Sequence, residues 1–370
     1  MKKKPIRIIQ FIGSLNTGGS QSMVMNIYRN IDRNKIQFDF IVDRKEELLY
    51  YDEILRLGGK VYIFNEFFKG TNYYKYEKQW KDFFESHKEY KIIHCHVRSV
   101  AAIVLRIAKK YNLITICHSH STSNGNGIKV FLKKFLQSKI KKYCDYFFAC
   151  SKESATWLYG NLIANSEKCF IINNAIDSKK YVFNKIIRNK IRKKYHIENK
   201  IVIGQVGRLT EVKNYEFTLK LLKQLVDKNN SYFLMIVGAG QLRKKIDKQI
   251  EDNNLKDNVI ILENRNDVNE LMQAMDIYVM PSLWEGLPLA LVEAQASSLP
   301  CIISSNITDG ILIHSLVKKL NLDDINLWIN EINRITNDNF KRVDVSKMII
   351  DSGFDINTNV RTIMDFYLKL

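Results

Sequence analysis

The chain has 370 residues, of which 46% are hydrophobic, and its formal net charge is +18. This length fits two domains of about 150–200 residues, and no apolar run reaches the roughly 18 residues that a membrane-spanning helix requires. The six cysteines form no Cys-x-x-Cys pair, which argues against a disulfide or zinc framework and predicts buried thiols in a reducing cytosol. The short apolar run after Pro5 has no cleavage site of small residues, so we interpret it as a first strand rather than a signal peptide.

The positive charge is concentrated in the first half of the chain. Residues 1–185 contain 32 Lys and Arg against 16 Asp and Glu, whereas residues 186–370 contain 25 against 23. Such a basic half either faces an anionic partner or presents a solvated basic surface, and an acidic membrane or a nucleic acid both fit. No zinc-finger, RNP or helix-turn-helix signature accompanies the charge, so we do not expect a nucleic acid as partner.

Apolar, strand-like runs alternate with helical patterns throughout this first half. Strands are predicted at residues 6–11, 38–42, 60–64, 91–96, 113–118 and 146–150. Helices are predicted between them at residues 23–28, 51–57, 74–86, 100–111 and 129–143. Repeated β-α-β units with apolar strands indicate a parallel sheet that is covered on both faces.

Two segments of the first half carry alternative interpretations. The glycine-rich loop at 13–20 lets backbone approach a ligand closely, but it matches neither the P-loop nor the dinucleotide fingerprint. A tight turn explains this loop equally well. The helix at 129–143 is basic and amphipathic, so it either packs on the core with its lysines in solvent or docks on an anionic membrane.

A polar, basic stretch at about 184–200 is interpreted as a hinge region. A second series of strands follows it at residues 201–206, 232–237, 259–262, 277–280 and 300–304. We therefore predict an α/β protein with two Rossmann-like, doubly wound parallel-sheet domains that face an interdomain cleft. The N-terminal domain is expected to span residues 1–185, joined by a C-terminal helix at 356–370, and the C-terminal domain residues 186–355.

Four of the seven histidines lie at the ends of two predicted strands. His94 and His96 end one strand, and His118 and His120 end another. Metal ligation was considered, but no Asp, Glu or Cys set with ligand spacing accompanies these histidines. We interpret them as polar residues that line a substrate cleft, with ordinary buried histidines as the alternative.

Two cations follow the first strand of the second half. Arg208 lies at the strand end and Lys213 at the start of the next helix, so both can converge on one diphosphate. The Asp-x-Asp sequence is the commonest short signature of a metal-bound diphosphate, and the chain contains none. These residues therefore predict a metal-free diphosphate clamp, with simple surface charges as the alternative.

The segment 277–295 combines a strand, a turn and a helix. Pro288 suits the first position of the helix, where a missing N–H costs nothing. Glu285 lies in the turn and Glu293 about one helical turn in, with free helix N-terminal amides between them. This arrangement fits a ligand with an anionic diphosphate and many hydroxyls, such as a sugar nucleotide. Alternatively, the glutamates are an ordinary turn residue and an exposed helix residue.

Taken in order, these features resemble one family. The matching residues are Gly18-Gly19, His120, Asn174 to Asp177, Gly207-Arg208, Lys213-Asn214, Gly238-x-Gly240 and Glu285-x7-Glu293. They make the chain similar to glycosyltransferase family 4, the group 1 glycosyltransferases of GT-B fold, and to its branch in bacterial exopolysaccharide, capsule or O-antigen synthesis. The resemblance covers nearly the whole chain.

The resemblance implies a reaction. A hexose would move from a nucleotide sugar, expected to be a UDP-sugar, to a glycan or lipid-linked saccharide with retention of anomeric configuration. No divalent metal and no other cofactor are expected. The protein would be cytoplasmic, and peripheral on the inner face of the cell membrane if the basic half docks there. The alternative is a catalytically inactive GT-B module that binds a nucleotide sugar or a nucleic acid.

The resemblance also implies a site. Glu285 would hold the donor sugar and His120 would lie beside it near the reacting carbon, as the catalytic pair. His96 and His118 are expected on the acceptor side. Glu293 would accept hydrogen bonds from the ribose. The full set of implied donor-binding residues is Gly18, Gly19, Arg208, Lys213, Gly238, Gly286, Leu287, Leu289, Ala290 and Glu293.

Overall fold

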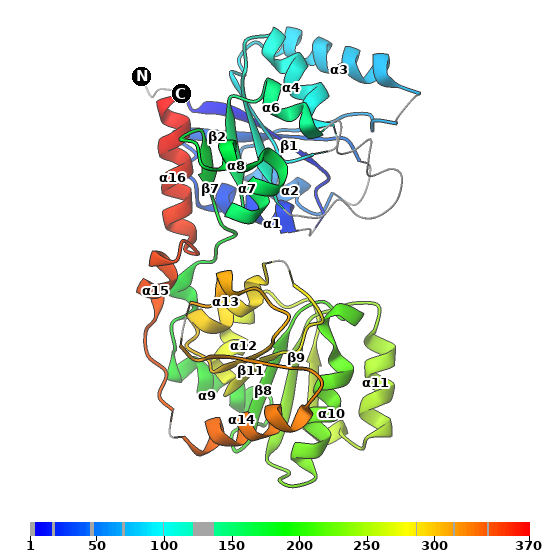
Figure 1. Cartoon of the computed structure of the whole chain (residues 1–370), viewed down its shortest axis with the longest axis vertical. Coiled ribbons are helices and arrows are strands. Elements are labelled where there is room, and N and C mark those ends of the chain that lie inside the picture. The colour runs from blue at the N-terminus through cyan, green and yellow to red at the C-terminus, as the bar shows by residue number, and fades with distance from the viewer. Residues whose placement is uncertain are drawn as a thin grey trace. The chain divides into compact units, whose positions relative to one another are not determined.

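The computed structural model describes residues 4–16, 19–44, 48–68, 71–98, 100–120, 137–285, 287–313, 315–338 and 340–370 (Figure 1). The chain forms two compact units. The first comprises Met1–Asn174 and Ile356–Leu370, and the second comprises Ala175–Asp355. Within the described ranges, no helix combines the length and the apolar character needed to cross a membrane.

The first unit is a seven-stranded parallel sheet. Its strands are β1 (Ile6–Gly13), β2 (Ile36–Val42), β3 (Val61–Ile63), β4 (Ile92–Cys95), β5 (Ile114–Ser119), β6 (Tyr146–Ala149) and β7 (Cys169–Ile171), in the order β3-β2-β1-β4-β5-β6-β7. Its helices are α1 (Gly19–Asn30), α2 (Tyr51–Arg56), α3 (Tyr73–Ser86), α4 (Ala101–Lys110), α6 (Ile140–Tyr143), α7 (Lys152–Tyr159), α8 (Asn161–Ala164) and α16 (Ile356–Lys369). The strand order reverses between β1 and β4, which is where ligands bind in such sheets.

The second unit is a six-stranded parallel sheet. Its strands are β8 (Ile201–Val206), β9 (Tyr232–Val237), β10 (Val259–Leu262), β11 (Ile277–Met280), β12 (Cys301–Ser304) and β13 (Val317–Leu320), in the order β10-β9-β8-β11-β12-β13. Its α-helices are α9 (Lys185–Lys194), α10 (Tyr215–Val226), α11 (Arg243–Asp252), α12 (Val268–Ala274), α13 (Leu289–Ala296), α14 (Ile325–Asn337) and α15 (Ser346–Asp351). Short 3-10 turns are η1 (Ser178–Tyr181), η2 (Glu211–Lys213), η3 (Lys256–Asn258) and η4 (Asp309–Ile311).

Both faces of the second sheet are covered, as the apolar strands predict. Val202 and Ile203, neighbours on β8, belong to two different hydrophobic cores. This follows from the two-residue period of a strand, which sends successive side chains to opposite faces. One core includes residues of α12 and α13, and the other includes residues of α10 and α14.

The first unit ends at Asn174, whereas the sequence analysis placed this boundary after residue 185. The intervening residues pack on the second unit. Ile176 pairs with Asp355 in an isolated bridge, and the hydroxyl of Tyr181 donates to Glu293. The return of the chain at Ile356 brings α16 into the first unit, where it packs beside α1 (red and blue in Figure 1).

The interpretation of residues 184–200 as a hinge was wrong. This stretch contains α9, and the side chain of Asn184 caps its N-terminus by accepting from the amides of Ile186 and Ile187. Arg188 and Arg192 pair with Asp276 and donate to backbone carbonyls at the end of α12. The basic residues that suggested a solvated linker therefore stabilise a helix C-terminus, where cations are favoured.

Two edge strands were not predicted from the sequence. β7 has three residues that are all partly exposed, and β13 carries two lysines in its four residues. Short edge strands protect a sheet against unwanted pairing. The lysines of β13 interrupt its apolar signal, and the three residues of β7 are too few to show a strand pattern. The predicted basic helix at 129–143 lies largely outside the described residues, which include only its last turn as α6.

Candidate functional site

The candidate donor-binding group lies at the carboxyl edge of the second sheet. Gly207 follows β8, and a Cβ placed there would lie 2.8 Å from Cε of Lys213. A Cβ on Gly238, which follows β9, would lie 1.9 Å from the carbonyl oxygen of Gly207. Glycine is therefore required at Gly238, where backbone approaches so closely, whereas a Cβ on Gly207 would meet only the flexible lysine side chain.

Lys213 and Glu285 form an ion pair within this edge. Nζ of Lys213 lies 2.5 Å from Oε1 of Glu285, and the two side chains are only 16% and 13% exposed. A hydrogen bond also fixes the backbone of Lys213, because Nε2 of Gln205 donates to the carbonyl oxygen of Lys213 at 2.7 Å. The amide of Leu283 donates to the carbonyl of Val212, which holds the loop that carries Glu285 against η2. A lysine ammonium has three donors, so this pair leaves Lys213 able to bind an anion as well.

Glu293 lies on α13 and receives a hydrogen bond that the sequence analysis did not foresee. The hydroxyl of Tyr181, from η1, donates to Oε1 of Glu293 at 2.7 Å. Burial raises the pKa of Glu293 to about 7, and the hydrogen bond from Tyr181 opposes this rise. Tyr181 lies 112 positions away in the chain, so no local pattern could have predicted this contact.

The remaining predicted donor-side residues lie close to Lys213 or Glu285 in the sequence. Arg208 is exposed directly after Gly207, and its side chain makes no ion pair with the residues that the structure describes. Leu287, Leu289 and Ala290 are half-buried at the start of α13, which begins at Leu289 with Pro288 as its N-cap rather than its first residue. Gly286 lies outside the described residues.

A separate candidate group is a cluster of four histidines in the first unit, which we call the histidine cluster (His94, His96, His118 and His120). His94 and His96 come from the end of β4, and His118 and His120 from the end of β5. Each pair shares one face of the sheet because residues two apart on a strand point the same way. The rings stack, with centroids 4.4 Å apart for His94 and His96 and 4.1 Å apart for His118 and His120.

The glycine-rich loop after β1 is described only in part. Gly19 begins α1, and Gly18 lies outside the described residues.

A chain of hydrogen bonds ties this cluster to β1 and α16. Nε2 of His96 lies 2.8 Å from Oε1 of Gln10, and this amide oxygen can only accept. Nδ1 of His96 therefore accepts from Nε2 of His120, also at 2.8 Å. Nε2 of Gln10 donates to the hydroxyl of Tyr367, which lies 2.5 Å from Nδ1 of His94. Gln10 and Tyr367 thus orient the histidines, although neither stood out in the sequence.

Burial keeps the histidine cluster uncharged. It lowers the pKa of His94 and of His120 to about 3, and it lowers the pKa of His96 and of His118 well below the ordinary value. Nearby positive charge contributes in the same direction, from the neighbouring histidines and, for His120, from Arg98. At neutral pH these rings are neutral donors and acceptors rather than cations.

This burial predicts an acid-sensitive first unit. The pKa of His94 is about 3 in the folded protein and about 6.5 when unfolded. Between these values the unfolded chain binds a proton that the folded chain does not, so stability is lost as pH falls below 6.5. At pH 5 we expect His94 to cost about 2 kcal/mol relative to pH 7. Urea unfolding of the wild type and His94→Asn at both pH values measures this loss, and an equal loss in both proteins would contradict it.

Comparisons with known proteins give the family. Residues 17–180 match the family model of Glycosyltransferase Family 4, and residues 187–312 match that of the Glycosyl transferases group 1. The chain is 30% identical to EpsF of Bacillus subtilis, a protein named as a glycosyltransferase, over 99% of this chain and 97% of EpsF. It is 36% identical to the UDP-Gal:alpha-D-GlcNAc-diphosphoundecaprenol alpha-1,3-galactosyltransferase of Escherichia coli, over 45% of this chain and 44% of that enzyme.

A solved structure supports the same fold. HepE of Anabaena, solved in complex with UDP, superimposes with a TM-score of 0.80 over 98% of this chain and 100% of HepE, at 17% identity. Two parallel α/β sheets with Rossmann-like strand order, together with this neighbour, confirm the predicted GT-B fold. Because EpsF matches almost end to end and both family models match, this chain belongs to glycosyltransferase family 4, the group 1 glycosyltransferases.

Proposed function

We propose that this glycosyltransferase moves a hexose from a UDP-sugar to a lipid-linked saccharide, with retention of configuration, in the synthesis of a bacterial surface polysaccharide. The observation that carries the proposal is the Lys213–Glu285 pair. Glu285 lies in the loop before α13, the helix that carries Glu293. A cation that binds phosphate, a carboxylate that binds sugar hydroxyls and a helix N-terminus meet at one sheet edge. This is the set of groups that a sugar nucleotide requires.

The identity of the donor and acceptor is supported by the relatives. The Escherichia coli relative is named for a UDP-galactose donor and an acceptor on diphosphoundecaprenol. HepE has been solved with UDP-glucose as well as with UDP. We extend both features to this chain as proposals. The excess of 16 positive charges in residues 1–185 suits an acceptor carried on an anionic membrane surface on the cytoplasmic side.

The proposed reaction uses charge stabilisation and positioning. The acceptor hydroxyl attacks the anomeric carbon on the face from which UDP departs, and its proton passes to the departing diphosphate. Arg208 and Lys213 offset the negative charge that develops on that diphosphate, which is the dominant kind of stabilisation for such a step. Glu285 holds the hexose in position for this attack. No metal is assigned to this step.

Calorimetric titration of the purified full-length chain with UDP and with GDP, in the presence of EDTA, tests the donor. We expect UDP to bind and GDP to bind at least 10-fold more weakly. Preferential binding of GDP would change the donor class and leave the family assignment intact. Binding of neither nucleotide would favour an inactive module. The anomeric signal of the transfer product in proton NMR then tests retention, and inversion would refute it.

A further inference from the structure

The histidine cluster contains more unpaired nitrogen atoms than a purely structural role explains. Among the described residues, neither ring nitrogen of His118 has a hydrogen-bond partner, and Nε2 of His94 has none. The side chains of His94 and His118 are almost fully buried, at 2% and 1% exposure. Buried polar atoms are satisfied in the great majority of cases, and each unpaired one costs about 1–3 kcal/mol. Several such atoms in one place indicate a missing partner that all of them share.

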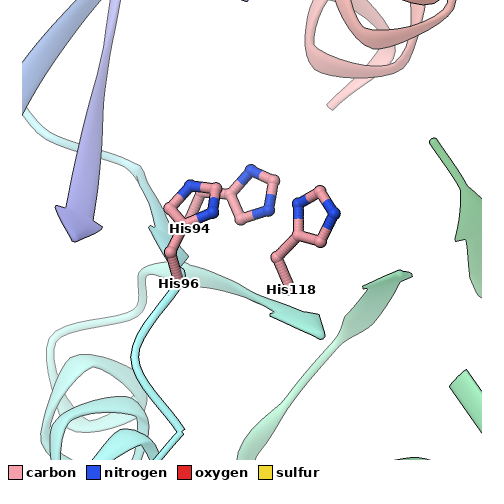
Figure 2. A group of neighbouring side chains, drawn as sticks. All are labelled: His94, His96 and His118. Carbon is pink, nitrogen blue, oxygen red and sulfur yellow. The ribbon is translucent and has the colours of Figure 1, made fainter. Parts of the chain in front are cut away.

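The geometry of the three deepest histidines fits a shared ion. Each of His94, His96 and His118 offers one ring nitrogen such that the three atoms lie within 4.8 Å of one another. Figure 2 shows these imidazoles next to one another at the ends of β4 and β5. Ring centroids are 4.4–5.3 Å apart. Ligand nitrogens around a tetrahedral zinc ion are roughly 3.3 Å apart. To bind such an ion, the three rings therefore have to rotate until their ligating nitrogens reach this separation.

Two of the three imidazoles already have the outer partners that metal ligands use. A ligating histidine donates its second ring N–H to an oxygen, which fixes the nitrogen that faces the ion. His96 does this with Oε1 of Gln10, which leaves its Nδ1 as ligand. Nδ1 of His94 lies 2.5 Å from the hydroxyl of Tyr367, which leaves its Nε2 as ligand. His118 can use either nitrogen.

We propose that His94, His96 and His118 bind one transition-metal ion of the zinc class in the first unit. The ligands are three imidazoles without a carboxylate, a set that suits Zn²⁺, Co²⁺, Ni²⁺ or Cu²⁺ and not Mg²⁺ or Ca²⁺. Binding requires His96 to exchange its hydrogen bond with His120 for the ion. The fourth position is left to water or a substrate oxygen.

The site can be tested on the full-length chain without a polyhistidine tag, after removal of metals with a chelator. Zinc titration by calorimetry is expected to give about one ion per chain, and Co²⁺ is expected to give visible absorption bands of a low-coordinate site. His118→Asn should abolish this binding. Tyr367→Phe should weaken it about 10–100-fold, as loss of an outer partner does. The zinc titration contains no nucleotide, so its result is independent of the proposed sugar transfer.

The matched control is His196→Asn. His196 is exposed, and its φ of 55° lies in the left-handed region that asparagine tolerates. This control should retain full binding. If the wild type binds no zinc, or if His118→Asn binds as well as the control, the proposal is wrong. Should His118→Asn fail to fold, X-ray absorption of zinc-loaded wild type decides, because fewer than three imidazole ligands would also overturn it.

Discussion

Replacement of Lys213 by Ala is expected to lower kcat of sugar transfer by about 10²–10³-fold, the loss typical when a preorganised charge partner of the transition state is removed. Lys213 is fixed from two sides, by Glu285 at its ammonium and by Gln205 at its backbone. A cation held in place before the reaction stabilises a departing diphosphate without having to reorganise. Steady-state kinetics with the UDP-hexose that the enzyme accepts measure the effect.

The control for Lys213 is Lys220→Ala. Lys220 lies on α10, where it pairs with Glu216, and both side chains are exposed. Lys220→Ala therefore removes the same charge as Lys213→Ala from the same unit. We expect nearly unchanged kinetics, because exposed helix pairs contribute about 0.3–0.5 kcal/mol. A similar loss in both variants would mean that net charge alone is responsible. A rise in KM with unchanged kcat would mean that Lys213 contributes only to ground-state binding.

A second comparison separates catalysis from stability. Lys213→Ala leaves the carboxylate of Glu285 without its partner in a mostly buried place, which destabilises the fold. The double variant Lys213→Ala with Glu285→Gln removes that lone charge. Its thermal stability should recover relative to Lys213→Ala, whereas its turnover should stay low. Recovery of both would show that the ion pair is structural and that neither residue acts on the donor.

The sequence predicted those parts of the protein that depend on local patterns. Strands β8, β9, β10 and β11 have the bounds that their apolar runs indicated, because buried parallel strands are continuous apolar segments. The bounds of such strands are decided by neighbours along the chain. Gly207 and the Gly238-x-Gly240 segment were recognised through the family resemblance, and the close approach of backbone at Gly238 explains the glycine there.

Contacts between distant segments could not be predicted in this way. Tyr181, Gln10 and Tyr367 are ordinary residues by composition, and their roles depend on partners 86 to 357 positions away. The basic stretch containing Arg188 and Arg192 was misinterpreted for the same reason, since its partner Asp276 lies 84 to 88 positions away in the sequence. Charge in a sequence says that a side chain needs a partner and does not say which one folding provides.

Replacement of Glu293 by Ala is expected to weaken UDP binding about 10–150-fold, because hydrogen bonds to a charged group contribute about 1.5–3 kcal/mol. The fold should be retained, since Glu293 is half-buried and contacts Tyr181 by a single hydrogen bond. Calorimetry with UDP measures the affinity, and thermal unfolding checks the fold. An unchanged affinity would remove Glu293 from the ribose site.

The pH dependence of UDP binding tests the same carboxylate without changing its position. The pKa of Glu293 is about 7, so a fall from pH 8 to pH 6.5 protonates it and removes part of its capacity to accept from the ribose. UDP affinity should therefore fall over this range in the wild type and stay flat in Glu293→Gln, once the titration of the phosphate itself is subtracted. Tyr181→Phe removes the hydrogen bond that opposes the raised pKa, so the fall should begin at higher pH. If the wild type and Glu293→Gln followed the same pH profile, protonation of Glu293 would have no part in nucleotide binding.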